Sequence, residues 1–366
     1  DKKKLETIIK KYELKTLSEK LNIKTKKEVI KKDYNLIKNL KELKQIIKEC
    51  KLNKIYSFDT ETTSLDFHKA ELVGFSLSYE NNLSFYCPLS HNSADDVNLP
   101  FDDTLDILRE LFEDESLTVI GQNLKYDINV LKKYSMIFKN RIEDTMLMSY
   151  VLSSSGKHDM DTLSSKFLDH KPISYESVAG KGKDQISFAD VEISKAVEYA
   201  CEDADLTFLL YQKLSTLLKK DKKLLKIYTE IEIKLMMIIA DMEYIGVSLN
   251  NKELSKQSQN LAKRINKIEK SIYKISGREF NISSPKQIQE IFYDELKLPI
   301  LKKTPKGQPS TNEDVMSQLA EDHELPNLIL SYRNLLKLKN TYTDKLGDQV
   351  SNISNRLHTS YNQTIT

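Results

Sequence analysis

Asp59 and Glu61 stand one residue apart in the stretch SFDTETTSL, directly after a segment with the composition of a buried strand. Side chains alternate between the two faces of a strand, so both carboxylates would point the same way. Two adjacent anions repel each other unless a positive charge lies between them, and a hard divalent cation such as Mg²⁺ takes oxygen ligands. From this pair alone, solvated carboxylates at an exposed strand end are the simpler explanation. A metal site requires further acids that converge on the pair.

Two more polar pairs occur later in the chain at helical spacing. Asn123 and Asp127 are four residues apart in GQNLKYDINVL, and Tyr199 and Asp203 are four apart in VEYACEDADLTF. Residues at this spacing share one face of a helix. Each pair alone says little, because acidic residues on helices usually face water. The order along the chain is more specific: DxE on a strand, NxxxD on a helix and YxxxD on a later helix.

A mixed α/β region must position these side chains. Short β-rich segments with turn residues between them predict a β-meander followed by a further strand, and stretches of helical periodicity flank them. This mixture is typical of one compact α/β domain. The predicted strands lie around 54–59, 71–79, 83–89 and 117–120, and the predicted helices over 35–50, 103–113 and 123–134.

From about Ser187 onward the pattern is helical throughout. The sequence predicts helices over 188–220, 222–245 and 251–276. A further helix should start at Pro285, because serine followed by proline is a frequent helix beginning. The stretch KKTPKGQPS at 302–310 predicts a loop. We place a domain boundary near 215–225.

Charge is distributed unevenly along the 366 residues, although the net charge is only +2. Residues 1–50 carry 16 Lys and 8 acidic residues, a net charge of +8. Residues 51–200 carry 15 basic and 25 acidic residues, a net charge of −10. This segregation indicates different roles for different segments. A general abundance of lysine in the source proteome explains part of it.

The cysteine positions and the hydropathy of the chain indicate the kind of compartment in which the protein works. Cys50, Cys87 and Cys201 are far apart and outside any CxxC spacing, which excludes a disulfide framework and a zinc site and indicates a reducing, intracellular compartment. The longest apolar run, 235–240, is too short to span a membrane. The bias toward Lys, Asn, Ile and Tyr indicates an AT-rich genome and suggests an organelle, a plastid of the apicoplast kind.

The three polar motifs resemble the exonuclease motifs of the proofreading domain of family A DNA polymerases, the bacterial DNA polymerase I type. The resemblance extends from about residue 30 to the end of the chain. Within the exonuclease region it rests on LVGFSLS (72–78), DTMLMSYVL (144–152), KHDMDTLSSKFL (157–168) and AGKGKDQISF (179–188). Later, EFNISSPKQIQEIF (279–292), LKKTPKGQPSTNEDV (301–315) and YRNLLKLKNTYTDKL (332–346) resemble the polymerase thumb, and RLHTSYNQTIT (356–366) resembles the start of the palm.

This resemblance implies an α/β, ribonuclease-H-like 3′-5′ exonuclease domain with a mixed sheet, followed by a mainly α-helical thumb and the start of the palm. The implied domains are a basic N-terminal arm at 1–34, the exonuclease at 35–218, the thumb at 219–355 and the beginning of the palm at 356–366. The family continues into palm and fingers beyond this point. We therefore expect these residues by themselves not to polymerise DNA.

The resemblance also implies two-metal hydrolysis with Mg²⁺ or Mn²⁺. Asp59, Glu61 and Asp203 would ligate one ion, which lowers the pKa of a bound water so that it attacks the terminal phosphorus as hydroxide. Asp59 would bridge to a second ion about 3.5–4 Å away, which stabilises the departing 3′ oxygen. Asp127 would hold that second ion through water.

The remaining implied roles concern the nucleophile and the 3′ end. Tyr199 would orient the nucleophile and stay protonated, because a phenol has an ordinary pKa near 10. Asn123 would support a ligand's orientation. Leu65, Tyr126 and Tyr175 would pack against the last bases of a frayed single strand. Core packing is the alternative for all three, and we favour the functional role for Leu65.

In the thumb-like half, the expected partner is the primer-template duplex, bound by a monomer with no membrane contact. Contacts of lysine and arginine with phosphates position a duplex without reading its sequence. Any single lysine is better explained as a solvated surface charge, so the prediction rests on the combination of motifs. The predicted contacts are Lys302, Lys303, Thr304 and Lys306 on a loop tip, and Arg333 and Lys337 on one helical face.

Two other functions stay open at this point. A stand-alone 3′ exonuclease of the ribonuclease D type would share the acidic residues, but the thumb-like segments after residue 279 speak against it. A non-catalytic DNA-binding clamp would not require the acids at all four positions.

Overall fold

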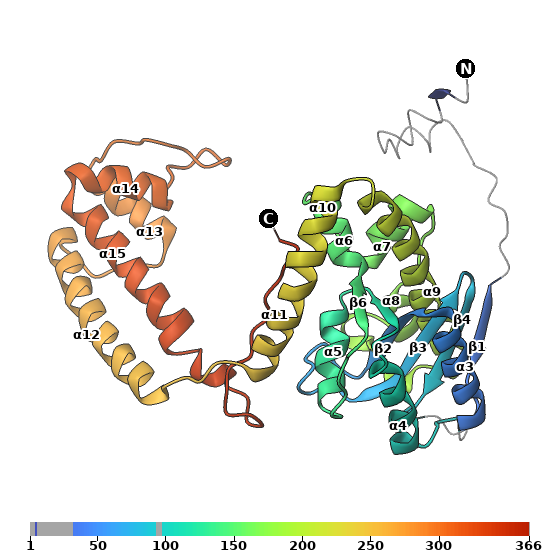
Figure 1. Cartoon of the computed structure of the whole chain (residues 1–366). Helices are drawn as coiled ribbons and strands as arrows, with labels where there is room; N and C mark the ends of the chain where they lie inside the picture. The colour runs from blue at the N-terminus through green and yellow to red at the C-terminus, as the bar shows by residue number, and fades with distance from the viewer. Residues whose placement is uncertain (1–3, 6–31, 93–96, 366) are drawn as a thin grey trace. The chain divides into compact units, whose positions relative to one another are not determined.

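The computed structural model describes residues 4–5, 32–92 and 97–365, which are drawn in colour in Figure 1. Most of the predicted basic arm lies outside these residues. The chain divides into two compact units, the first formed by Asp1–Ala240 with Asn362–Thr366 and the second by Asp241–Tyr361. The domain limits expected at 34, 218 and 355 stay predictions.

The first unit is built on one six-stranded mixed sheet with the strand order β1-β4-β3-β2-β5-β6. Two antiparallel pairings, β4 with β3 and β3 with β2, lie between parallel pairings at both edges. The strands are β1 (Asp33–Leu36), β2 (Ile55–Thr62), β3 (Leu72–Glu80), β4 (Leu83–Pro88), β5 (Thr118–Gly121) and β6 (Arg141–Asp144). The acidic pair therefore lies on a strand inside the sheet rather than at its edge.

The predictions for β2 to β5 are confirmed, whereas the two outer strands were not predicted. The helix expected from residue 35 begins only with α3 (Leu40–Asn53), because Asp33–Leu36 pairs with β4 as strand β1. Asn39 fixes this start: its side chain accepts a hydrogen bond from the backbone N–H of Glu42. Such a cap satisfies one of the free N–H groups of the first turn.

Helices cover the sheet on both faces. On one face, α3 and α4 (Phe101–Phe112) enclose a core that contains Phe58, Phe75 and Phe112. On the other, α9 (Ile193–Leu218) lies against β2, β3 and β4 (Figure 1). Predicted to begin at 188, this helix starts five residues later, after the short turn η3 (Phe188–Asp190). The helix α5 (Leu124–Lys132) follows β5 after a two-residue turn, and α6 (Thr145–Leu152) follows β6 directly.

The second unit is helical, with its own small core of residues such as Ile272, Phe292 and Met316. The helix predicted over 251–276 is confirmed by α12 (Asn251–Ser276), which Gly277 ends in the left-handed conformation. The predicted start at Pro285 is also confirmed, since Ser284 caps α13 (Pro285–Gln289). After the helical turn η5 (Glu290–Glu295) come α14 (Glu313–Asp322) and α15 (Glu324–Leu338).

Candidate active site

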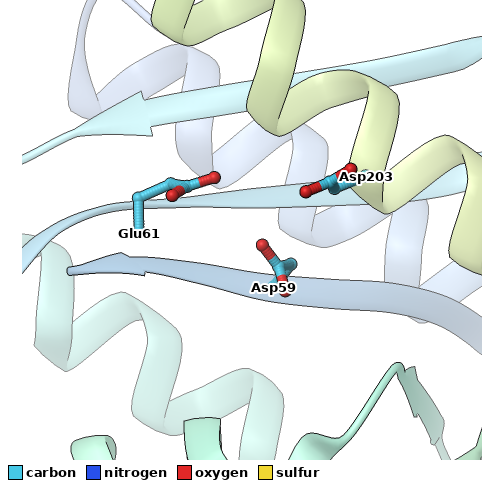
Figure 2. A group of neighbouring side chains, drawn as sticks. All are labelled: Asp59, Glu61 and Asp203. Atoms are coloured by element: carbon cyan, nitrogen blue, oxygen red, sulfur yellow. The ribbon is translucent and has the colours of Figure 1, made fainter. Parts of the chain in front are cut away.

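Three carboxylates from two elements meet beside the middle of the sheet. Asp59 and Glu61 come from β2 and Asp203 from α9, and one oxygen of each lies within 4.8 Å of the others. Figure 2 shows the three carboxylates directed toward one another. Strand alternation places the two β2 side chains on the face that α9 covers, as the spacing predicts.

Small residues let α9 approach the sheet closely. Ala196, Ala200 and Ala204 recur every four residues on the helix, and all three are fully buried. The hydroxyl of Ser57 on β2 donates to the carbonyl oxygen of Ala204 at 2.7 Å. This bond ties the strand to the helix one residue away from Asp203.

Burial and mutual repulsion shape the electrostatics of the cluster. Burial is the largest cause that raises the pKa of Asp59 and of Glu61 well above the usual range, and the neighbouring carboxylates add to it. Burial likewise raises the pKa of Asp203 to about 7, although a hydrogen bond from Tyr199 favours its charged form. The cluster therefore retains protons near neutral pH unless a positive charge joins it.

The donor set fits a hard divalent cation. All three side chains offer carboxylate oxygens, the ligands that Mg²⁺ and Mn²⁺ prefer. One of them, Oε1 of Glu61, is buried and has no hydrogen-bond partner among the described residues. Buried polar atoms are rarely left unsatisfied, so this oxygen is available as a metal ligand.

Asp127 lies next to the cluster but outside the group of three. It is 3% exposed, and its Oδ1 accepts hydrogen bonds from the backbone N–H of Thr60 at 3.0 Å and from the Thr60 hydroxyl at 2.5 Å. Its charge still contributes to the raised pKa of Glu61. Thr60, which the sequence analysis passed over, thus connects the strand of the acidic pair to α5.

Asn123 does not lie on the helix, contrary to the prediction of a shared helical face with Asp127. It precedes α5 in the left-handed conformation, with φ of 63°. Asparagine tolerates this conformation better than most residues, which accounts for its presence here. A sharp turn of the chain therefore brings it to the start of the helix.

Tyr199 donates its hydroxyl hydrogen bond to Asp203. Burial, followed by the charge of Asp203, raises the pKa of this phenol above its ordinary value, so Tyr199 holds its proton. Its ring is fixed among aromatic neighbours, with the centroid of Phe188 at 5.9 Å and that of Tyr175 at 6.0 Å. Tyr199 is therefore a fixed hydrogen-bond donor to Asp203, and its expected role in orienting the nucleophile stays a prediction.

The three residues predicted to pack on a 3′ end differ in exposure. Leu65 is 93% exposed, so core packing does not explain it. Tyr126 is half-buried, and its hydroxyl contacts Oγ1 of Thr62 at 2.5 Å and donates to the carbonyl oxygen of Ser64 at 2.6 Å. Tyr175 is also half-buried and stacks on Phe188 at 6.3 Å.

The residues of the second unit that were predicted to contact a duplex differ in their exposure to solvent. Lys302, Lys303, Lys306 and Lys337 are exposed, and Thr304 is half-buried. Arg333 is half-buried as well, and its Nη1 donates to the carbonyl oxygen of Thr311 at 2.9 Å.

Asp144 is a supporting residue that the sequence analysis missed. It is fully buried; its Oδ1 accepts from the backbone N–H of Leu147 at 2.9 Å, and its Oδ2 accepts from that of Leu124 at 2.7 Å. One carboxylate therefore caps both α6 and α5, the helix that carries Asp127. The available signal was an aspartate at the junction of strand β6 and a helix, a frequent N-cap residue.

Two family models match this chain. Residues 34–219 match the 3′-5′ exonuclease family, and residues 251–366 match DNA polymerase family A. The chain belongs to the 3′-5′ exonuclease family, and its later part is similar to DNA polymerase family A. The converging carboxylates all lie in the part that matches the exonuclease family, and that domain family implies use of divalent metal ions.

Curated proteins that are similar to this chain include bacterial DNA polymerase I enzymes. The DNA polymerase I of Pseudomonas aeruginosa is 40% identical over 338 residues, an alignment that covers 91% of this chain and 37% of that protein. The DNA polymerase I of Rhizobium leguminosarum is also 40% identical, covering 90% of this chain and 34% of the relative. The chain therefore spans about a third of the length of these relatives.

A solved structure shares the fold. It is the POL domain of Pol1 from M. smegmatis in complex with DNA primer-template and dNTP, with a TM-score of 0.72 and 21% sequence identity. The match covers 91% of this chain and 53% of that chain. The expected fold class, an α/β exonuclease domain followed by a helical polymerase region, is confirmed. Within the described part of the chain, no helix combines the length and apolar character needed to cross a membrane.

We predict that the stabilisation of this chain by divalent metal grows with pH. The pKa of Asp203, raised to about 7, means that the folded chain binds more protons here than the unfolded chain between about pH 4 and 7. The metal-free protein should lose stability over that interval as pH rises, while metal and protons compete for the same oxygens. Thermal melts with Mn²⁺ or EDTA at pH 6 and pH 8 should show the larger metal-induced shift at pH 8.

Asp203→Asn provides the control for this prediction. The variant lacks the titrating carboxylate, so its metal-induced shift should be smaller and should change less between the two pH values. Equal shifts at pH 6 and pH 8 in the unchanged chain would contradict the prediction.

Proposed function

We propose that this chain removes mononucleotides from the 3′ end of DNA by hydrolysis with two divalent ions, Mg²⁺ or Mn²⁺, as the proofreading part of a family A polymerase. The observation that carries the proposal is the convergence of Asp59, Glu61 and Asp203 within 4.8 Å in the exonuclease-matched domain. In this role Asp59, Glu61 and Asp203 would hold one ion, and Asp59, together with Asp127 through water, would hold the other. Bound ions of this kind lower the pKa of water and neutralise negative charge on a phosphate.

The chain's own residues orient the reactants. Tyr199 keeps its proton and donates its one O–H to Asp203, so its hydroxyl oxygen would accept a hydrogen bond from the attacking water and orient it. Asn123 and Thr60 act indirectly, Asn123 through the turn into α5 and Thr60 through its bonds to Asp127. The exposed Leu65 wedges against the terminal base, and the rings of Tyr126 and Tyr175 offer surfaces for stacking, worth about 1–3 kcal/mol per base.

The second unit grips the primer-template duplex in this proposal. Exposed Lys302, Lys303, Lys306 and Lys337 meet phosphates, with Thr304 beside them. Nucleotide addition belongs to the longer family A polymerase, as in the relatives of which this chain spans about a third. We further propose that the protein works as a monomer. Composition alone supports its placement in a plastid.

The test of the exonuclease proposal uses two labelled DNA duplexes that differ only in the last base pair of the 3′ end. With Mg²⁺, the chain should release mononucleotides from both, and faster from the mispaired end, because a frayed terminus costs less to unpair. An RNA strand of the same sequence should react more slowly. Preference for RNA, or release of internal fragments, would contradict the proposal.

A further inference from the structure

The basic loop, residues 302–308, is a short hairpin with an exposed tip. Its lysines, Lys302, Lys303 and Lys306, all extend from a backbone that is held by internal contacts. These contacts join Thr304 to Gln308 at 2.7 Å, Gly307 to Thr304 at 2.8 Å, Ser310 to Lys302 at 2.8 Å, and Lys303 to Pro309 as an antiparallel bridge. The three cations therefore sit on a defined backbone.

Three side chains hold the strand that returns from this loop, and we call Gln289, Tyr293 and Arg333 the loop clamp. They come from three different elements, α13, η5 and α15. Each donates to one of three consecutive carbonyl oxygens. The contacts are Gln289 Nε2 to Pro309 at 2.6 Å, the Tyr293 hydroxyl to Ser310 at 2.7 Å, and Arg333 Nη1 to Thr311 at 2.9 Å.

The loop clamp is anchored in the core of the second unit. Tyr293 is buried there with Phe292 beside it, and Ser310 and Thr311 are buried as well. Burial also lowers the pKa of Arg333, whose guanidinium is partly withdrawn from water. A hydrogen bond in such a place is costly to lose, because the partner is left buried and unsatisfied.

We propose that the loop clamp is a positioning device for duplex DNA: it holds the lysines of the basic loop in the arrangement that meets phosphates, and Arg333 acts through this loop rather than on a phosphate. The inference rests on the proposed duplex-binding function. A loop that must be ordered on binding loses conformational entropy, and a loop already held in shape avoids that loss.

The test measures duplex binding by the 366-residue chain over a range of salt concentrations. Tyr293→Phe removes one hydroxyl and keeps the ring, so the core should stay packed. We expect affinity for a blunt DNA duplex to fall about tenfold, the scale of one lost buried hydrogen bond. The slope of log affinity against log salt should not change, because the same phosphates are neutralised. Amide hydrogen exchange over 302–311 should become faster.

Gln289→Ala and Arg333→Ala should behave in the same way as Tyr293→Phe, and Gln289→Ala serves if Tyr293→Phe fails to fold. The matched control is Tyr342→Phe, at a tyrosine that is 49% exposed in the same unit, and it should change neither measurement. Lys303→Ala is the contrast: it should weaken binding and also reduce the salt slope by about one.

Two results would overturn the inference. One is unchanged affinity and unchanged amide exchange in Tyr293→Phe and Gln289→Ala. The other is a salt slope that falls as much in Arg333→Ala as in Lys303→Ala, which would make Arg333 a direct phosphate contact. If the unchanged chain fails to bind duplex DNA, the proposed function fails, and the exchange measurement still decides whether the clamp orders the loop.

Discussion

Replacing both acids of β2, in Asp59→Asn with Glu61→Gln, is expected to lower 3′-end hydrolysis at least about 10³-fold. The two amides keep the shape of the side chains but remove two of the three converging anions, so the cluster can no longer hold divalent ions tightly. Duplex binding should stay close to that of the parent chain, because the basic loop is untouched. Single-turnover hydrolysis of a labelled 3′ end and binding to the same DNA would measure both.

The same double variant should be more heat-stable than the parent chain in the absence of metal. Like charges at the cluster oppose folding, and the variant removes them. A gain of about 1 kcal/mol would raise the melting temperature by about 2–4 °C in a domain of this size. The control is Asp102→Asn with Glu115→Gln, two exposed acids with the same change in charge. Full hydrolytic activity in Asp59→Asn with Glu61→Gln would show that the acidic cluster is not the site of hydrolysis.

Phe58→Ala is expected to destabilise the first unit by about 3–5 kcal/mol. The ring is fully buried beneath the acidic pair, at 5.0 Å from the ring of Phe112 and 5.8 Å from that of Phe75. Its removal leaves a cavity in a core that holds β2 against α4. Denaturant unfolding should report the loss of free energy, and the melting temperature should fall by roughly 10 °C.

Leu52→Ala is the matched control for this prediction. Leu52 is 65% exposed on α3, so its truncation removes little buried surface and should cost no more than about 0.5 kcal/mol. A loss of under 1 kcal/mol in Phe58→Ala would mean that the ring is not needed to hold the strand.

Much of the fold was predictable because it follows from short-range patterns. The alternation around Asp59 and Glu61 placed both on one face of β2, and helical periodicity predicted the limits of α12. The acidic convergence was expected from the order of the motifs and their resemblance to a family. The sequence spacing alone left open whether β2 and α9 lie together.

What could not be predicted depends on contacts between distant residues. Strands β1 and β6 have four residues each, and they are strands because β4 and β5 pair with them. Asn123 lies outside the expected helix because its backbone φ is positive, and no spacing pattern in the sequence predicts this angle. Arg333 carries the positive charge expected of a phosphate contact. Its hydrogen bond to Thr311 instead follows from the packing of α15 against the returning loop.

The alanines of α9 have a consequence for the geometry of the acidic cluster. Asp203 lies on the helix, whereas Asp59 and Glu61 lie on the strand. The distance between their carboxylate oxygens therefore depends on how closely the alanine methyl groups let the helix approach the sheet. A larger side chain at Ala200 or Ala204 would act as a spacer and increase that distance. Residues that carry no ligand atom thus help to set the spacing of the three carboxylates.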